Sequence, residues 1–227
     1  MLEFPHIRIK STLLSERPRE ESRLIAVLSI MLVLFVAMLC WREPEWFRLL
    51  AASPRGVFAE GEYWRLLTAI AVHADLRHFL ANALFFTFFA YLLYGYFGFW
   101  IHPVSTLAFG ALTNCLALLT YPPDVRLVGA SGVVYLMAGF WLTLYVFIER
   151  TRTPARRLLH AVGVGLVVLI PTSLSPEVSY RTHAIGCGLG MAAAVCYFRI
   201  RKEQIRSREI FEFEGIEIEG GETNWVN

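Results

Sequence analysis

Long uncharged stretches alternate with short polar connections along most of the chain. A bilayer core about 30 Å thick needs roughly 20 helical residues to cross it, and six apolar runs match that length or fall slightly short. The fifth run is the weakest of the six. The runs lie at about 24–41, 79–100, 101–121, 131–148, 155–173 and 183–198. The pattern predicts an all-α, polytopic membrane protein built as one bundle of six transmembrane helices.

Composition agrees with a membrane protein. Of the 227 residues, 56% are hydrophobic and 18% charged, whereas soluble domains are about a quarter charged. The first run starts late and lacks a small-x-small site before Arg42, so we expect a retained anchor and not a cleaved signal peptide. The four cysteines lie inside or at the end of predicted spans without metal-ligand spacing. The sequence therefore predicts no disulfide, metal site or cofactor.

Basic residues near helix ends predict the orientation. They gather in 8–23, 150–157 and 199–208, whereas the loops around 124–126 and 173–181 are short and nearly neutral. Because basic loops stay in the cytoplasm, both termini are predicted to be cytoplasmic. The resulting organisation is a cytoplasmic segment 1–23, a six-helix domain 24–198 and a cytoplasmic tail 199–227.

Two connecting segments have patterns of their own. The first external loop, about 42–76, is rich in aromatic residues and is expected to lie at the membrane interface as short helices. The tail alternates apolar and acidic residues over 211–219. This period of two fits an exposed strand or hairpin, although a solvated tail would carry it equally well.

With this topology, the second, fourth and sixth helices all begin at the outer face. Their first turns carry His78 and Asn82, Ser131, and His183. Polar residues within spans are costly and are therefore functional candidates. Three helix starts, far apart in sequence, thus place polar groups at one depth.

Ser131 lies in Gly129-Ala130-Ser131-Gly132, which opens the fourth span. Small neighbours leave its hydroxyl approachable, and free N–H groups at a helix start can stabilise an oxyanion. A small-residue motif for helix packing would look the same.

His183 opens the sixth span, with Gly186 and Gly190 on the same helical stripe. Stacked glycines let two membrane helices approach closely, which a histidine needs if it is to reach a short serine side chain. His183 could then act as the general base for Ser131. A histidine at a helix end can also be purely structural.

His78 and Asn82 are four residues apart and share one helical face. Both can donate hydrogen bonds to a developing oxyanion. Asn82 could instead simply bridge two helices.

As a set, these motifs resemble the rhomboid family of intramembrane serine proteases over roughly residues 24–198. Trp64-Arg65 is similar to the family's first-loop motif, His78-x-x-x-Asn82 to its second-span motif, Gly129-x-Ser131-Gly132 to its nucleophile motif and His183-x-x-Gly186-x-x-x-Gly190 to its sixth-span motif. The resemblance implies a Ser131–His183 dyad without an aspartate.

The resemblance also implies supporting roles. Tyr135 would pack on the ring of His183, Trp64 and Arg65 would organise the first loop, and an oxyanion hole would form from His78, Asn82 and the N–H of Ser131. Ala90 and Tyr94 depart from the family pattern, in which Gly and Glu stand at these positions.

Other intramembrane proteases fit less well. A metalloprotease needs HExxH, which is absent, and His73 and His78 are five apart, poorly placed for one metal. An aspartyl protease needs two intramembrane aspartates, but Asp75 and Asp124 are the only aspartates and both lie in loops. Two non-enzymatic readings remain: a catalytically inactive rhomboid-like protein that binds membrane clients, and a small transporter.

We therefore expect a serine endopeptidase that cleaves transmembrane protein substrates near the outer face. It would contact membrane lipid and would have no nucleic-acid partner. The sequence does not define its oligomeric state. The N-terminal segment mixes three glutamates with its arginines, unlike a mitochondrial presequence, which favours a prokaryotic inner membrane.

Overall fold

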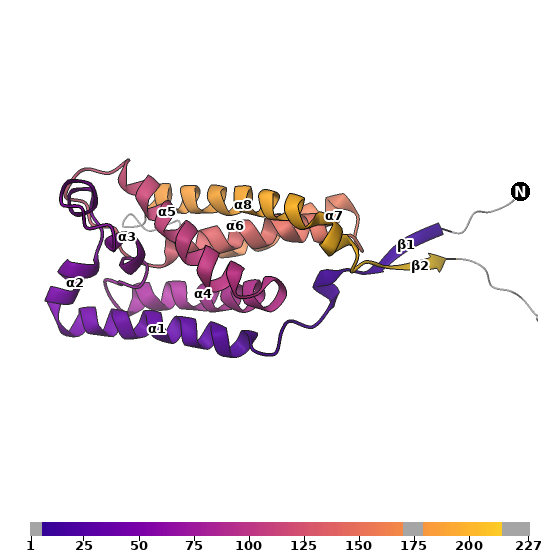
Figure 1. Ribbon diagram of the computed structural model, residues 1–227, viewed down its shortest axis with the longest axis horizontal. Helices are drawn as coiled ribbons and strands as arrows, with labels where there is room; N and C mark the ends of the chain where they lie inside the picture. Colours follow the sequence, from indigo (N-terminus) through magenta and orange to yellow (C-terminus); the bar gives the residue numbers. More distant parts are fainter. Residues whose placement is uncertain (1–5, 170–178, 215–227) are drawn as a thin grey trace, which may run out of the picture.

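The computed structural model describes residues 6–169 and 179–214. It is a bundle of long helices with a two-stranded ribbon projecting from one end (Figure 1). The long helices are α1 (Ser22–Arg42), α4 (Leu76–Phe97), α5 (Thr106–Leu118), α6 (Ser131–Ile148), α7 (Pro154–Leu169) and α8 (Tyr180–Arg206). The shorter elements are η1 (Leu13–Ser15), α2 (Pro44–Leu50), η2 (Arg55–Ala59), α3 (Arg65–Thr68), η3 (Trp100–Ser105), β1 (His6–Ser11) and β2 (Ile210–Glu214).

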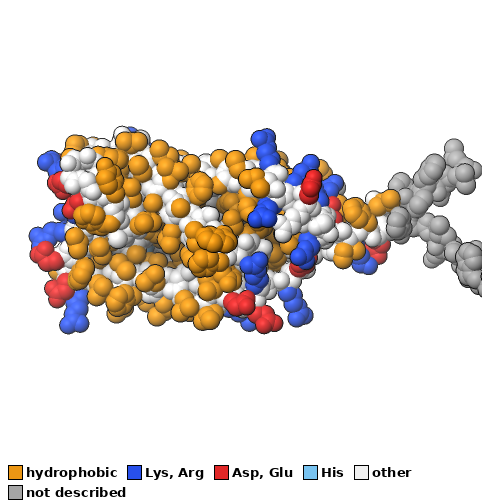
Figure 2. Space-filling view, viewed as in Figure 1, with side chains coloured by type: hydrophobic (Ala, Val, Ile, Leu, Met, Phe, Trp, Pro, Cys, Tyr) orange, Lys and Arg blue, Asp and Glu red, His pale blue; other side chains and the backbone are white. Residues whose placement is uncertain are grey.

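The helices are long and apolar enough to form a polytopic membrane bundle. Within the described part of the chain, five helical stretches reach spanning length and hydropathy: α1, α4, η3 with α5, α6 and α8. The sixth helix, α7, has 16 described residues, and the end predicted for it near residue 173 lies outside the described residues. Figure 2 shows hydrophobic side chains covering the middle of the molecule, with charges at the two ends. The prediction of an all-α membrane bundle is confirmed.

Two helices begin about one turn before the apolar runs that predicted them. The run 79–100 corresponds to α4, which begins at Leu76 because the carboxylate of Asp75 accepts the backbone N–H of His78 at 2.7 Å. Likewise Ser179 accepts the N–H of Thr182 at 3.2 Å and starts α8 ahead of the apolar run. Hydropathy misses a polar first turn, whereas an N-cap side chain defines it.

The helix α6 occupies the centre of the bundle. Most of its residues are buried, and it packs against α4, α5, α7 and α8. By contrast, α1 lies at the edge and contacts mainly α4, with Ala26, Val33 and Ala37 buried at helical spacing. Its opposite face, including Leu32 and Phe35, is exposed and is apolar as a lipid-facing surface requires.

The connection between α1 and α4, predicted as the first external loop, contains α2, η2 and α3, so the prediction of short helices there is confirmed. The tail prediction is correct in part. Ile210–Glu214 is a strand, but it pairs antiparallel with β1, with Arg8 opposite Glu212 and Ile9 opposite Phe211. Periodicity cannot reveal a partner about 200 residues away, and the rest of the predicted strand, 215–219, lies outside the described residues.

Candidate active site

The first turns of α6 and α8 are held together by backbone contact between the two helices. A Cβ placed on Gly186 would lie 2.3 Å from the carbonyl oxygen of Gly132, and one on Gly190 would lie 2.0 Å from that of Leu136. From the other side, a Cβ on Gly139 would meet the carbonyl oxygen of Cys187 at 2.4 Å. No side chain fits at these positions, so glycine is what permits the approach.

This contact brings together the first turns of the two helices that carry the predicted nucleophile and base. Ser131 is the first residue of α6 and is half-buried. His183 lies in the first turn of α8, is 4% exposed and stacks on Tyr135 with ring centroids 3.9 Å apart and planes 16° apart. Tyr135 is one helical turn from Ser131, so both lie on the α6 face that the imidazole covers.

No carboxylate orients this imidazole in the described part of the chain. The Nδ1 of His183 is buried and has no hydrogen-bond partner there. In a Ser-His-Asp triad, an aspartate at this nitrogen holds the ring. Here the ring's position is set by its stacking on Tyr135 and by the packing of α8.

His78 lies on the other side of the nucleophile segment. A Cβ on Gly129 would lie 2.7 Å from both Nε2 and Cε1 of the imidazole, so the ring rests against the glycine backbone. Gly129 has φ +106° and donates its N–H to the carbonyl of Ala69 at 2.9 Å. A side chain is disfavoured at position 129 for two reasons: the positive φ of the backbone, and the clash of a Cβ with the ring of His78.

Asn82 follows one turn later on α4 and is 4% exposed. Its Nδ2 donates to the backbone carbonyl of His78 at 2.9 Å. That bond uses one of the two amide hydrogens, so one donor remains. His78 and Asn82 thus lie on the α4 face nearest the start of α6.

His73 belongs to this cluster, although the sequence pattern suggested it only as a rejected metal ligand. Its Nδ1 lies 3.1 Å from the carbonyl of Ala71, and its Nε2 accepts the backbone N–H of Ala130 at 3.4 Å. Burial lowers its pKa to about 4, so the ring is neutral and both nitrogens are used. The spacing His73-x-x-x-x-His78 was the available signal, but the contact with Ala130 is tertiary and cannot be derived from spacing.

Arg65 holds together the connection between α1 and α4, while the side chain of Trp64 points outward. The guanidinium of Arg65 donates to Glu62 at 2.5 Å and to the backbone carbonyls of Arg48 and Ala51 at 2.5 and 2.8 Å. The side chain of Trp64 is 48% exposed, which suits an aromatic residue at the membrane interface.

The same loop is tied to the segment that leads into Ser131. Ala52 and Leu127 exchange two backbone hydrogen bonds of 3.1 and 2.7 Å. The departures from the family pattern lie elsewhere: Ala90 is fully buried within α4, and Tyr94 lies one turn further along it.

The chain is thus a helical membrane bundle in which Ser131 and His183 lie in the first turns of two helices packed through glycines. Comparison with known proteins identifies the family. The model of the Rhomboid domain matches residues 60–200. The chain therefore belongs to the rhomboid family and is an integral, multi-pass membrane protein.

Two relatives illustrate the range of the family. The chain is 31% identical over 173 residues to "Putative rhomboid protease YdcA" of Bacillus subtilis (strain 168), covering 76% of this chain and 86% of the relative. It is 27% identical over 190 residues to "Rhomboid-related protein 2" of Mus musculus, covering 74% of this chain and 61% of that protein. The chain thus spans most of the bacterial relative and under two thirds of the mouse protein.

Proposed function

We propose that the protein is an intramembrane serine endopeptidase that cleaves transmembrane segments of other proteins near the outer membrane face. One observation carries the proposal. The imidazole of His183 stacks on Tyr135, on the face of α6 that begins with Ser131, while glycines bring the two helices into contact. This arrangement of a serine and a histidine on different helices depends on the close packing of α6 and α8.

The proposed reaction uses these two side chains in turn. As the Oγ of Ser131 attacks the substrate carbonyl carbon, its proton passes to His183 and the carbonyl oxygen becomes an oxyanion. Collapse breaks the C–N bond, and His183 returns the proton to the leaving amine. A water then gives a proton to His183 and attacks the acyl carbonyl carbon. The bond from this carbon to the Oγ of Ser131 breaks, His183 returns the proton to Oγ, and the new carboxyl group leaves.

The oxyanion is proposed to be stabilised by three donors. These are the backbone N–H of Ser131, the remaining amide hydrogen of Asn82 and the imidazole of His78, which rests against the nucleophile segment. Loss of one such donor costs on the order of 3 kcal/mol of transition-state stabilisation.

The charge distribution supports the proposed orientation. Basic residues follow α6 and α8 and precede α1. Because basic segments stay in the cytoplasm, we propose that α6 and α8 begin at the opposite, outer end of the bundle. Both termini would then lie in the cytoplasm, with residues 24–198 as the protease domain between the cytoplasmic segments 1–23 and 199–227. A prokaryotic plasma membrane is the location that we propose.

The substrates are proposed to be transmembrane proteins whose helices unwind easily near the outer face. A helix hides its carbonyls in hydrogen bonds to residues four positions on, so a segment of low helix propensity exposes them at lower cost.

Cleavage of a model single-span substrate by the reconstituted protein tests the proposal. We expect cleavage near the outer end of the substrate helix, abolished in both Ser131→Ala and His183→Ala while thermal unfolding stays cooperative. If the wild-type protein binds the substrate without cutting it, the protein is a catalytically inactive member that binds clients.

A further inference from the structure

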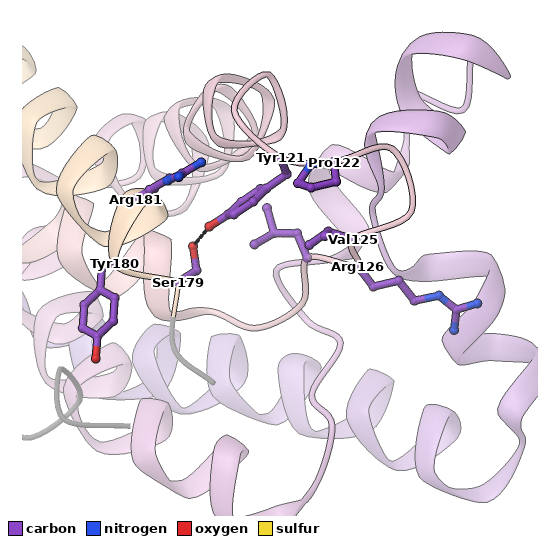
Figure 3. Close-up of a pocket in the computed structure, with 8 residues that line it drawn as sticks. Tyr121, Pro122, Val125, Arg126, Ser179, Tyr180 and Arg181 are labelled. Carbon is purple, nitrogen blue, oxygen red and sulfur yellow. Dashed lines mark hydrogen bonds between the residues drawn. The ribbon is translucent and has the colours of Figure 1, made fainter. Parts of the chain in front are cut away.

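A cavity of about 480 Å³ lies at the outer end of the bundle, between the segment that follows α5 and the first turn of α8 (Figure 3). Leu127 lines it from one side and Arg181 from the other. Leu127 is four residues before Ser131, and Arg181 is two residues before His183. The two segments that form the cavity are thus the ones that lead into the proposed nucleophile and base.

The cavity carries two positive charges that no carboxylate of the described residues neutralises. Arg181 and Arg126 both line it, and neither forms an ion pair with any carboxylate of residues 6–169 and 179–214. Three other arginines of the same outer face are paired: Arg48 with Glu45, Arg55 with Asp124 and Arg65 with Glu62.

The positions of both guanidinium groups are set by neutral partners. Arg181 donates to the carbonyl of Thr120 at 2.6 Å, and its guanidinium carbon lies 5.9 Å from the ring centroid of Tyr121. Arg126 lies at the opposite end of the cavity, with its guanidinium carbon 5.9 Å from the ring centroid of Phe47. An arginine has five N–H donors, so both retain donors for a further acceptor.

Hydroxyl groups line the space between the two arginines. The hydroxyls of Tyr121 and Ser179 are hydrogen-bonded to each other across the cavity (Figure 3). Ser179 also caps α8 by accepting the N–H of Thr182, the residue before His183. The cavity wall is therefore continuous with the turn that positions the proposed base.

We propose that this cavity is a subsite for a carboxylate side chain of the substrate, on the extracytoplasmic side of the cleaved bond. The inference rests on the proposed endopeptidase activity and names a class among its substrates: membrane proteins with an aspartate or glutamate just outside the spanning segment. The cavity-lining Leu127 and Arg181 are close in sequence to Ser131 and His183, so we place the carboxylate a few positions outside the cut. Guanidinium groups suit carboxylates because their donors match the two oxygens.

The test compares matched substrates in uncharged, zwitterionic lipid vesicles. A single-span substrate carries Glu at one of the positions two to six residues outside the cut, and its partner carries Gln there. For the wild-type protein we expect kcat/KM to be about twofold to fivefold higher for Glu at one or two adjacent positions, as a partly exposed charge pair gives.

Variants identify the side chains that produce this preference. In Arg126→Gln/Arg181→Gln the ratio for Glu over Gln should fall to about one, and Arg181→Glu should prefer Lys at the same position. Arg77→Gln is the matched control, since Arg77 is an exposed arginine near the start of α4, outside the cavity. It should keep the wild-type ratio.

Three results overturn the inference, and they differ from one another. Equal cleavage of the Glu and Gln substrates by the wild-type protein removes the subsite and leaves the peptidase activity standing. A rate change on adding anionic lipid that is the same for both substrates assigns the cavity to lipid headgroups. Cleavage of neither substrate removes the proposed function itself.

Discussion

At the scale of single residues, the site depends on side chains that hold the backbone around Ser131. His73 is the clearest case, because its neutral imidazole accepts the N–H of Ala130 and approaches the carbonyl of Ala71. The N–H that it fixes is immediately before the proposed oxyanion donor at Ser131. His73 is therefore a positioning residue and not a catalytic one.

Replacing His73 with Phe should keep a ring in this space and remove both hydrogen bonds. A buried N–H without a partner costs about 1–3 kcal/mol, so we expect kcat to fall roughly 10-fold to 100-fold with little change in KM. The measurement is steady-state cleavage of a single-span substrate. His160→Phe is the matched control, because that ring packs tilted against Tyr145, which lies near the end of α6 that is far from Ser131. Wild-type turnover in His73→Phe would remove the positioning role.

The sequence predicted the candidate residues better than their contacts. Ser131, His183, His78 and Asn82 could be chosen because polar groups at helix starts are costly and therefore conspicuous. His73 could not, because its role depends on a loop folding back onto Ala130. The same holds for Arg181 and Tyr121, which meet only when α5 and α8 are packed together.

At the scale of elements, the contact between α6 and α8 determines where the two proposed catalytic groups lie. The glycine pattern of α8 is asymmetric. Gly190 faces the backbone of α6, whereas a Cβ on Gly188 would meet nothing within 4 Å. Substitutions at the two positions therefore distinguish the effect of close helix packing on activity from the effect of replacing a glycine within the helix.

Gly190→Ala should push α8 away from Leu136 and lower both activity and the unfolding temperature. Gly188→Ala should leave activity unchanged and, because alanine favours helix by about 1 kcal/mol, leave stability equal or slightly higher. Thermal unfolding and substrate cleavage of the two variants check this. Equal behaviour of both would mean that close helix approach is not required.

The ribbon of β1 and β2 is predicted to be sensitive to acid. Glu212 accepts hydrogen bonds from Lys10 and Arg8, and these cations lower its pKa. A carboxyl with a lowered folded-state pKa stabilises the ribbon above its unfolded pKa, and the contribution is lost as the pH falls through the lower folded value, below about 4.

Hydrogen exchange of residues 6–11 at pH 7 and below pH 4 measures this effect, after correction for intrinsic rates. Protection should decrease in acid for the wild-type protein, and Glu212→Gln should be less protected at pH 7 with a smaller acid effect. A pH-independent wild-type ribbon would show that pairing of the strands does not use these charges.

At the scale of the whole molecule, the orientation of the bundle in the membrane determines at which face the proposed site meets its substrates. The fold could be predicted from the sequence because six apolar runs and three basic segments leave few arrangements. The pairing of β2 with β1 could not be predicted, since the two strands are about 200 residues apart. The length of α8 could not be predicted either, because the helix continues through charged residues to Arg206.

Single cysteines placed in two connections test the orientation. In sealed right-side-out vesicles, Pro122→Cys in the connection after α5 should react with a membrane-impermeant maleimide, whereas Arg152→Cys before α7 should react only after the membrane is opened. The opposite pattern would place the site at the cytoplasmic face.

The most direct measurement of the central claim is covalent labelling with a fluorophosphonate, followed by mass spectrometry of the modified residue. It requires no knowledge of the substrate. The account predicts one adduct, on Ser131 of the folded wild-type protein, and no adduct in Ser131→Ala or His183→Ala. A folded wild-type protein that is not labelled, or one whose labelling survives His183→Ala, would contradict it.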